Sequence, residues 1–288
     1  MEKYEPRVLR KLQLTELEIL KDFDAICRKN SIPYVVFYGA GIGVLRHGGF
    51  IPWDDDIDVI LLRKDIKKLV QVLKENYSET YQVLSAEENI NFPLMTIQWG
   101  PKKTTFIIPE FKNLPCQFTV FLDIFPLDSI SNDDGKRKKQ RYSAWFWQKL
   151  MLLRQMPNPI IQYRGLKRKA FYFICGAIHI GMKIMHISPK WLYKKCKAAC
   201  LQYQDECTNK VAFLTDTRPG MSVFTTDELF PPRYLEFEGV KLPFPNKIET
   251  LLTRHYGDYM QLPPEEERRN HFPAVLDFGD GERYENDS

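Results

Sequence analysis

Apolar residues recur at helical spacing near the start of the chain and at strand spacing soon afterwards. The helical stripe predicts a helix over about residues 16–29, and Thr15 with Glu18 has the spacing of a capping box at its start. Pro33 then separates this helix from a short apolar run over residues 34–37. The chain is therefore expected to open with a helix followed by a buried strand.

Three glycines, Gly39, Gly41 and Gly43, directly follow the predicted strand. Glycine permits a tight turn and a close approach to a ligand, and a helix beginning here would offer free N–H groups to a phosphate. Their spacing matches neither a dinucleotide fingerprint nor a P-loop, so a plain glycine turn is the alternative.

Four carboxylates, Asp54, Asp55, Asp56 and Asp58, precede the apolar run 59–62. If the strand begins early, alternate aspartates share one face and the intervening apolar side chains enter a core. Like charges this close repel one another, and oxygen-only ligands suit Mg²⁺ or Mn²⁺. The sequence predicts a divalent metal site here, with a solvated acidic loop as the alternative.

The following hundred residues predict mixed helix and strand. The apolar spacing indicates a helix over residues 65–76 and strands over residues 81–84, 94–99, 105–108 and 118–125. The last strand is apolar on both faces except at Asp123, as expected of a central strand. A charge there is costly unless it is paired or bound to metal, so Asp123 is a third metal ligand, a base or half of a structural ion pair.

The net charge of +4 conceals a regional imbalance. Residues 135–204 hold sixteen Lys or Arg and no Asp or Glu, whereas the remainder holds 25 basic and 37 acidic residues. A local surplus points to one anionic partner at one place and argues against general nucleic-acid binding.

Within this basic region, residues 170–187 are apolar except for His179, Lys183 and His186, which would share one helical face. Basic clusters flank the segment, the first beginning at Arg164. A helix lying in a membrane surface, a buried core helix and a membrane-spanning helix all remain open.

Acidic residues return after residue 205. A hairpin turning at Glu238-Gly239, a helix of about ten residues capped by Asn246 and ended by Gly257, and a loose final fifteen or so residues are expected. Six cysteines are too few for a disulfide scaffold, and residues 1–6 do not form a signal peptide. A reduced, cytoplasmic setting is the expectation.

A strand, a glycine turn, a short helix and an aspartate-bearing strand together resemble the nucleotidyltransferase superfamily. Within it, residues 43–59 are similar to the hallmark of the LicD-type phosphocholine transferases, to which the fukutin-like proteins also belong. Residues 123–128 and 256–264 agree with the same family, and the resemblance spans about residues 15–130 and 205–271. Ala40 departs from the family pattern because it lacks a hydroxyl.

The resemblance implies an α+β fold with a nucleotidyltransferase-like mixed sheet flanked by helices. Residues 1–134 would form the catalytic core, residues 135–204 a basic helical insertion, and residues 205–288 the part that completes the catalytic domain.

The implied reaction moves a phospho-alcohol, usually phosphocholine, from a CDP-linked donor to a hydroxyl of a cell-surface glycan or its lipid-linked precursor, and CMP leaves. Lipopolysaccharide or teichoic acid would be the modified glycan. A nucleotidyltransferase releasing pyrophosphate and a catalytically inactive, membrane-associated relative are the alternatives. We expect a peripheral protein on the inner face of the cytoplasmic membrane, bound to its anionic surface.

The resemblance also implies roles for individual residues. Asp56, Asp58 and Asp123 would be catalytic, with Asp58 or Asp123 as the base, and the same three together with Asp54 would hold Mg²⁺ or Mn²⁺. The donor would be bound by residues of the turn and the loop: Gly39, Ala40, Gly41, Arg46, His47 and Trp53. Purely structural roles are the alternative for Arg46, His47 and Trp53.

Overall fold

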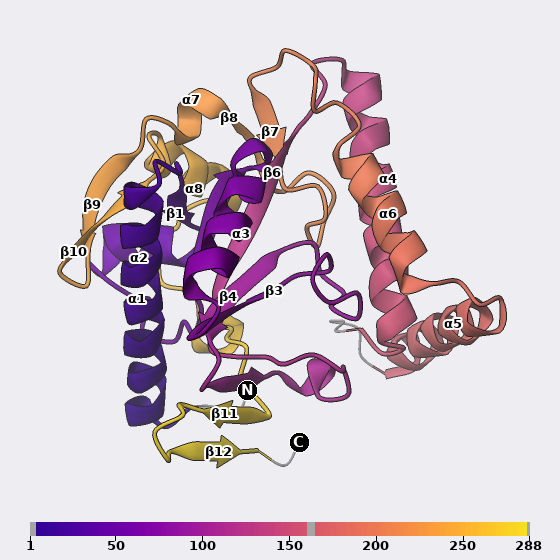
Figure 1. Cartoon of the computed structure of the whole chain (residues 1–288), viewed down its shortest axis with the longest axis horizontal. Coiled ribbons are helices and arrows are strands. Elements are labelled where there is room, and N and C mark those ends of the chain that lie inside the picture. Colours follow the sequence, from indigo (N-terminus) through magenta and orange to yellow (C-terminus); the bar gives the residue numbers. More distant parts are fainter. Residues whose placement is uncertain (1–3, 160–164, 287–288) are drawn as a thin grey trace.

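The computed structural model describes residues 4–159 and 165–286 (Figure 1). A seven-stranded mixed sheet forms its centre, with the path β1-β2-β6-β4-β3 and with β7 and β8 continuing from the C-terminal end of β6. Its strands are β1 (Val35–Phe37), β2 (Asp58–Leu62), β3 (Tyr81–Leu84), β4 (Ile97–Pro101), β6 (Leu122–Ser129), β7 (Lys210–Ala212) and β8 (Val223–Thr225). The mixed α+β class predicted from the sequence is confirmed.

Helices α1 (Pro6–Lys29) and α3 (Arg63–Tyr77) pack against this sheet (Figure 1). α1 begins ten residues earlier than predicted, so the Thr15 capping box is wrong. Thr15 Oγ1 instead donates to the Lys11 carbonyl inside the helix. Pro6 supplies the start, since its fixed φ suits the first helical turn.

Strand β2 begins only at Asp58, and residues 54–57 form an extended loop before it. The expectation that Asp54, Asp56 and Asp58 share one strand face is therefore wrong. The physical reason is the shortness of β1, because Tyr38 adopts a φ of 52° and turns the chain into α2 (Gly39–Arg46). The loop consequently has no neighbouring β1 residue with which to pair.

Three helices follow the central strand: α4 (Asp134–Gln155), α5 (Gly165–Ile184) and α6 (Pro189–Cys200). α4 and α6 lie side by side around a second hydrophobic cluster, and α5 projects away from the sheet (Figure 1). Over the described ranges, no single helix is long and apolar enough to cross a membrane. α5 and α6 meet that test only as a pair bent by 111°. The division of the chain at residues 135 and 205 stays a prediction.

The predicted polar face of α5 is wrong. His179 is buried, with Nδ1 2.7 Å from the Leu153 carbonyl oxygen, and His186 lies beyond the helix with a φ of 51°. Most other side chains of α5 are exposed, so it is not a buried core helix either. Arg164 of the flanking basic cluster lies outside the described residues.

The C-terminal part completes the fold. β9 (Arg233–Phe237) and β10 (Val240–Phe244) confirm the predicted hairpin, and α7 (Thr226–Leu229) and α8 (Ile248–Tyr256) pack beside it. Asn246 does not cap α8, because its side chain donates to the Asp227 carbonyl. Gly257, with a φ of 69°, does end that helix.

The predicted loose C-terminus is also wrong. β11 (Val275–Asp277) and β12 (Arg283–Glu285) join β5 (Thr105–Ile107) in a three-stranded sheet. Burial of Leu276 and Phe278 fixes this segment to the core. Two short 3₁₀ helices, Pro109–Phe111 and Glu265–Glu267, complete the described elements.

Candidate active site

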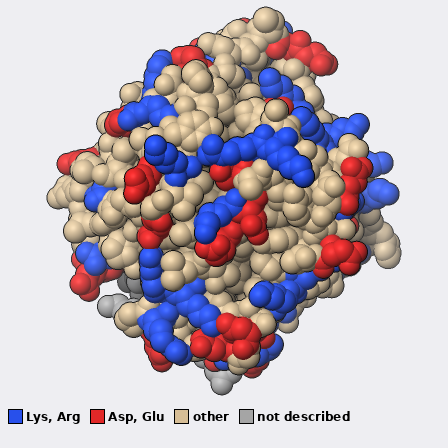
Figure 2. Space-filling view, turned by 60° about the vertical axis from the view of Figure 1, so that its left-hand side comes forward, with Lys and Arg blue, Asp and Glu red and all other residues tan. Residues whose placement is uncertain are grey.

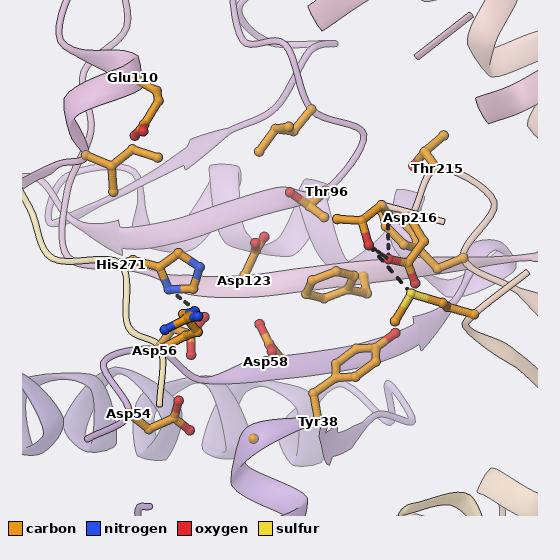
Figure 3. A pocket seen from close by; sticks show the side chains of 18 of the residues that line it. Tyr38, Asp54, Asp56, Asp58, Thr96, Glu110, Asp123, Thr215, Asp216 and His271 are labelled. Carbon is orange, nitrogen blue, oxygen red and sulfur yellow. Dashed lines mark hydrogen bonds and ion pairs between the residues drawn. The ribbon is translucent and has the colours of Figure 1, made fainter. Parts of the chain in front are cut away.

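A cavity of about 1470 Å³ lies beside the central sheet and extends to α4 and α5. Four carboxylates that the sequence singled out, Asp54, Asp56, Asp58 and Asp123, line it together (Figure 3). They come from a loop and two strands, so the fold gathers residues that are up to 69 positions apart.

Asp58 and Asp123 are register partners on the parallel strands β2 and β6, and their side chains leave the same face of the sheet (Figure 3). Burial raises the pKa of Asp58 well above its usual value, and the charges of Asp56 and Asp123 raise it further. Burial also raises the pKa of Asp123 to about 7, and its buried Oδ1 has no hydrogen-bond partner among the described residues. This pair therefore resists ionisation unless a nearby positive charge compensates it.

Asp54 and Asp56 reach the same space from the loop before β2. Gln13 holds this loop, donating to the Asp54 carbonyl at 3.0 Å. Burial and neighbouring carboxylates raise the pKa of Asp54 well above its usual value. Gly39 faces this aspartate across the cavity wall, and a Cβ at Gly39 would overlap Asp54 Oδ2. The first residue of α2 must therefore be glycine for Asp54 to keep its place.

Asp55 does not line the cavity and has a structural role that the sequence did not reveal. It is buried and accepts hydrogen bonds from the Tyr4 hydroxyl at 2.7 Å and from the His271 backbone N–H at 2.8 and 2.9 Å. It thereby ties the beginning and the end of the chain to the aspartate loop. No local pattern signals this, because the partners are 51 and 216 residues away.

The imidazole of His271 places a positive charge beside the carboxylates. Its Nδ1 lies 3.3 Å from Asp55 Oδ1 and 3.4 Å from Asp56 Oδ2. The charge of Asp56 and the hydrogen bond to Asp55 raise the pKa of His271 to about 10. His271 is protonated at neutral pH and neutralises part of the acidic cluster.

The predicted donor-binding residues divide into two groups. Gly39, Arg46 and Trp53 line the cavity, whereas Ala40, Gly41 and His47 do not. Ala40 and Gly41 are buried within α2, and His47 accepts a hydrogen bond from Arg46 Nε on the exposed side.

Two guanidinium groups flank the indole of Trp53. The Arg46 carbon Cζ lies 5.9 Å from the ring centre and that of Arg268 lies 4.4 Å from it. Arg46 also donates to the Tyr259 carbonyl at 2.7 Å. Arg46 and Arg268 therefore bring positive charge to the rim of the acidic cluster, where an anionic ligand would bind.

The far end of the cavity contains polar residues that the sequence did not indicate. Tyr38 and Asp216 both line the cavity (Figure 3). Ser222 links them, since the Tyr38 hydroxyl donates to Ser222 Oγ at 2.8 Å and Ser222 Oγ donates to Asp216 Oδ2 at 2.6 Å. Lys149 lies nearby, with Nζ 5.6 Å from the ring centre of Trp145, and burial lowers the pKa of Lys149. These groups come from distant segments without a common motif, so no sequence signal predicts their meeting.

A divalent cation such as Mg²⁺ requires several ligand atoms, mainly oxygens, around one point. The described residues hold one set whose three ligand atoms all lie within 4.8 Å, namely Asp55, Asp56 and His271. Asp55 already accepts three hydrogen bonds, and a metal at His271 would have to displace the proton that Asp55 and Asp56 stabilise. Asp58 and Asp123 differ, because a hard cation would compensate their charge and give the unpartnered Asp123 Oδ1 a partner. The chemistry of this pair suits Mg²⁺ or Mn²⁺, while no three of the described carboxylates that line the cavity bring ligand atoms within 4.8 Å of one another.

Comparisons with known proteins assign the chain to a family. Residues 31–152 match a family model described as LicD/FKTN/FKRP, nucleotidyltransferase domain. The chain is 30% identical over 274 residues to the lipopolysaccharide cholinephosphotransferase LicD of Haemophilus influenzae, an alignment that covers 91% of this chain and 95% of that protein. It is also 33% identical over 80 residues to an uncharacterized protein of Rickettsia prowazekii, covering 26% of this chain and 30% of the relative. The chain belongs to the LicD family, as the motif at residues 43–59 indicated.

Proposed function

We propose that this chain transfers phosphocholine from CDP-choline to a hydroxyl of lipopolysaccharide, or of its lipid-linked precursor, and releases CMP. The observation that carries the proposal is the pairing of Asp58 with Asp123 at a large cavity that Asp54 and Asp56 also line. The similarity to the Haemophilus influenzae protein over nearly its whole length supports phosphocholine as the group transferred and lipopolysaccharide as the acceptor.

We infer that Mg²⁺ or Mn²⁺ is the cofactor and that Asp54, Asp56, Asp58 and Asp123 hold it. A bound divalent ion supplies neutralisation of the diphosphate and of the charge that develops on the departing CMP. The clustering of these carboxylates around one cavity supports this assignment, since desolvation and mutual repulsion raise the pKa values of Asp54 and Asp58 despite the nearby charge of His271.

Phosphoryl transfer requires positioning and charge neutralisation more than covalent catalysis. The acceptor oxygen would attack the phosphorus that carries choline, the bond from that phosphorus to the CMP oxygen would break, and CMP would leave. Asp58 or Asp123 would accept the proton of the attacking hydroxyl. Gly39 at the start of α2 and Arg46 at its end would hold the donor phosphates.

We place the reaction at the inner face of the cytoplasmic membrane, with the protein bound peripherally. The regional basic surplus of residues 135–204 supports an anionic membrane surface as its partner and gives no reason to expect a nucleic acid. Choline is one of several alcohols that a CDP-linked donor can carry, so the donor is the first thing to test.

The test measures CMP release from CDP-choline, CDP-ribitol, CDP-glycerol and CDP-ethanolamine, with lipopolysaccharide as acceptor and with Mg²⁺, Mn²⁺ or EDTA. We expect metal-dependent release from CDP-choline, lost in Asp58→Asn and kept in Asp205→Asn, which changes an exposed aspartate outside the cavity. Pyrophosphate release from a nucleoside triphosphate instead would establish a nucleotidyltransferase. Turnover of no donor, with Asp58→Asn retaining biological function, would establish a catalytically inactive relative.

A further inference from the structure

Helix α5 exposes an unbroken apolar stripe on its outward side. The stripe consists of residues spaced three or four apart, which places them on one helical face. We call them the outer stripe: Leu166, Ala170, Phe173, Ala177, Ile180 and Ile184. Leu166 is 84% exposed, Phe173 79%, Ile180 57% and Ile184 71%, and none of the six positions carries a charge.

The opposite side of α5 fixes the helix to the protein. Cys175, His179 and Met182 are buried there, at spacings of four and three residues, and His179 contacts the Leu153 carbonyl of α4. α5 therefore has a second apolar face in addition to the one that packs against the protein. Folding does not require this second face, and contiguous exposed apolar side chains mark an interaction surface.

Basic side chains border the outer stripe at both ends of α5. Lys167, Arg168 and Lys169 lie in its first turn, and Lys190, Lys194 and Lys195 lie on α6 beyond the bend. All six are exposed, and none has an acidic partner within residues 4–159 and 165–286. The face shown in Figure 2 differs, since acidic and basic side chains are interspersed across it.

We propose that α5 lies in the surface of an anionic bilayer, with the outer stripe among the acyl chains and the bordering lysines and arginine at the lipid headgroups. An apolar helical face between cations is the arrangement by which a helix lies in a membrane interface. A second copy of the chain is a poorer occupant, because pairing two stripes would bring two uncompensated basic borders together.

The same helix separates the bilayer from the cavity. Ile174 and Ile178, on a flank of α5 next to the outer stripe, line the cavity together with Cys175 of the buried side. Leu152 and Met156 line it as well. When the outer stripe is docked, the apolar end of the cavity therefore lies next to lipid. The cavity volume of about 1470 Å³ leaves room for more than the donor alone. On the proposed function, this apolar end would take the lipid portion of the acceptor.

The experiment measures co-sedimentation of the full chain with vesicles of phosphatidylglycerol and phosphatidylethanolamine, and with vesicles of phosphatidylcholine, at low and high salt. We expect binding to the anionic vesicles, weakened by salt, and weak binding to phosphatidylcholine. The double variant Phe173→Ser, Ile180→Ser should reduce the partition coefficient at least about tenfold, because two large side chains no longer enter lipid. Both positions are exposed, so its thermal unfolding should match that of the unmodified chain.

The control is Tyr234→Ser, Leu14→Ser, which removes one aromatic and one aliphatic side chain, 52% and 44% exposed, from β9 and α1 on the other side of the molecule (Figure 1). It should bind within about twofold of the unmodified chain. Equal binding by both double variants, or no binding of the unmodified chain to anionic vesicles at low salt, would overturn the proposal. A dimer that the stripe variant converts to a monomer, without a change in vesicle binding, would assign the stripe to a second copy. CMP release from soluble donor, measured in parallel, keeps failure of docking distinct from failure of the proposed catalysis.

Discussion

At Asp58 the fold and the proposed function make opposite demands. Its folded-state pKa is raised, so the ionised form destabilises the metal-free protein, and this loss of stability grows as the pH rises above the ordinary aspartate pKa. We expect Asp58→Asn to stabilise the metal-free chain at pH 8, because asparagine cannot ionise in this buried, acidic surrounding. The gain should shrink as the pH falls, and it should disappear below the ordinary aspartate pKa, where the folded and the unfolded states are both protonated.

The same substitution should abolish stabilisation by Mn²⁺ and reduce CMP release at least about a hundredfold. Thermal unfolding at several pH values, with EDTA and with Mn²⁺, measures the first effect. Asp205→Asn, at an exposed position, should change neither quantity. If Asp58→Asn destabilised the metal-free chain and still responded to Mn²⁺, the assignment of Asp58 as a ligand would be incorrect.

Gly39 makes a second residue-scale prediction. A methyl group there would overlap Asp54 Oδ2, the end of a side chain that can move, so Gly39→Ala should displace the carboxylate and change the unfolding free energy by less than about 1 kcal/mol. Metal affinity, measured by titration calorimetry, should fall as well. Gly176→Ala on α5 is the control, because its added Cβ enters open space and should stabilise by about 0.5–1 kcal/mol. Equal effects of the two substitutions on metal affinity would refute the steric argument.

The two kinds of site residue differ in how far the sequence reveals them. The positions of Asp58 and Asp123 could be predicted for different reasons. Asp58 ends an acidic run that leads directly into an apolar strand, and Asp123 interrupts an apolar run, where a carboxylate is costly without a special role. Asp55 belongs to the same run, yet its structural role depends on Tyr4 and His271, which only the folded chain brings to it. Sequence patterns report a residue's own environment better than its distant partners.

Among the elements, α7 and α8 are joined by one carboxylate. Glu228 accepts from the Thr225 N–H at 2.8 Å and from both terminal nitrogens of Arg254. Burial alone would raise the pKa of Glu228, but the hydrogen bonds from Arg254 and Thr225 outweigh it and lower the pKa. The interaction therefore stabilises the folded chain at pH values above 4.5, the pKa of Glu228 in the unfolded chain. This stabilisation is lost as the pH falls through the lower pKa that Glu228 has in the folded chain.

We expect Glu228→Gln to cost about 1 kcal/mol at pH 7, with the difference from the unmodified chain disappearing near pH 3.5. Urea unfolding at the two pH values measures this. Glu236→Gln, an exposed position on β9, should leave stability within about 0.5 kcal/mol at both. A difference for Glu228→Gln that persisted at acid pH would show that packing, and not charge, carries the contribution.

Element types were more predictable than element limits. The hairpin β9–β10 was found because Glu238-Gly239 has turn chemistry that matches the twist of its strands. β11 and β12 were missed because three-residue strands have too little periodicity, and their partner β5 is some 170 positions away. The end of β1 at Phe37 was predicted correctly, but the start of β2 was not. β2 begins at Asp58 because Asp58 is the register partner of Phe37, and no hydrophobic pattern records which residues of two strands pair.

For the whole molecule, the central sheet and the helices α4–α6 have separate hydrophobic clusters but share one cavity. The central sheet and the loop before β2 supply the carboxylates, and α4 and α5 supply apolar side chains of the cavity wall. The basic surplus is confined to the part that supplies the apolar wall. The charge distribution along the sequence therefore predicted an anionic partner for the basic region. The cavity that joins this region to the carboxylates could not be predicted, because it forms only when the chain folds.

This division predicts unequal local stability. α5 has one buried face and is attached mainly through α4, whereas β6 lies inside the sheet with β2 and β4 on either side. Hydrogen–deuterium exchange should therefore label peptides from α5 much faster than peptides from β6, since opening α5 exposes little buried area. α4, which packs against both α5 and α6, should exchange at an intermediate rate. Protection of α5 equal to that of β6 in the free protein would mean that the helix has a further partner covering its outer stripe, and the rate with anionic vesicles present would then not change.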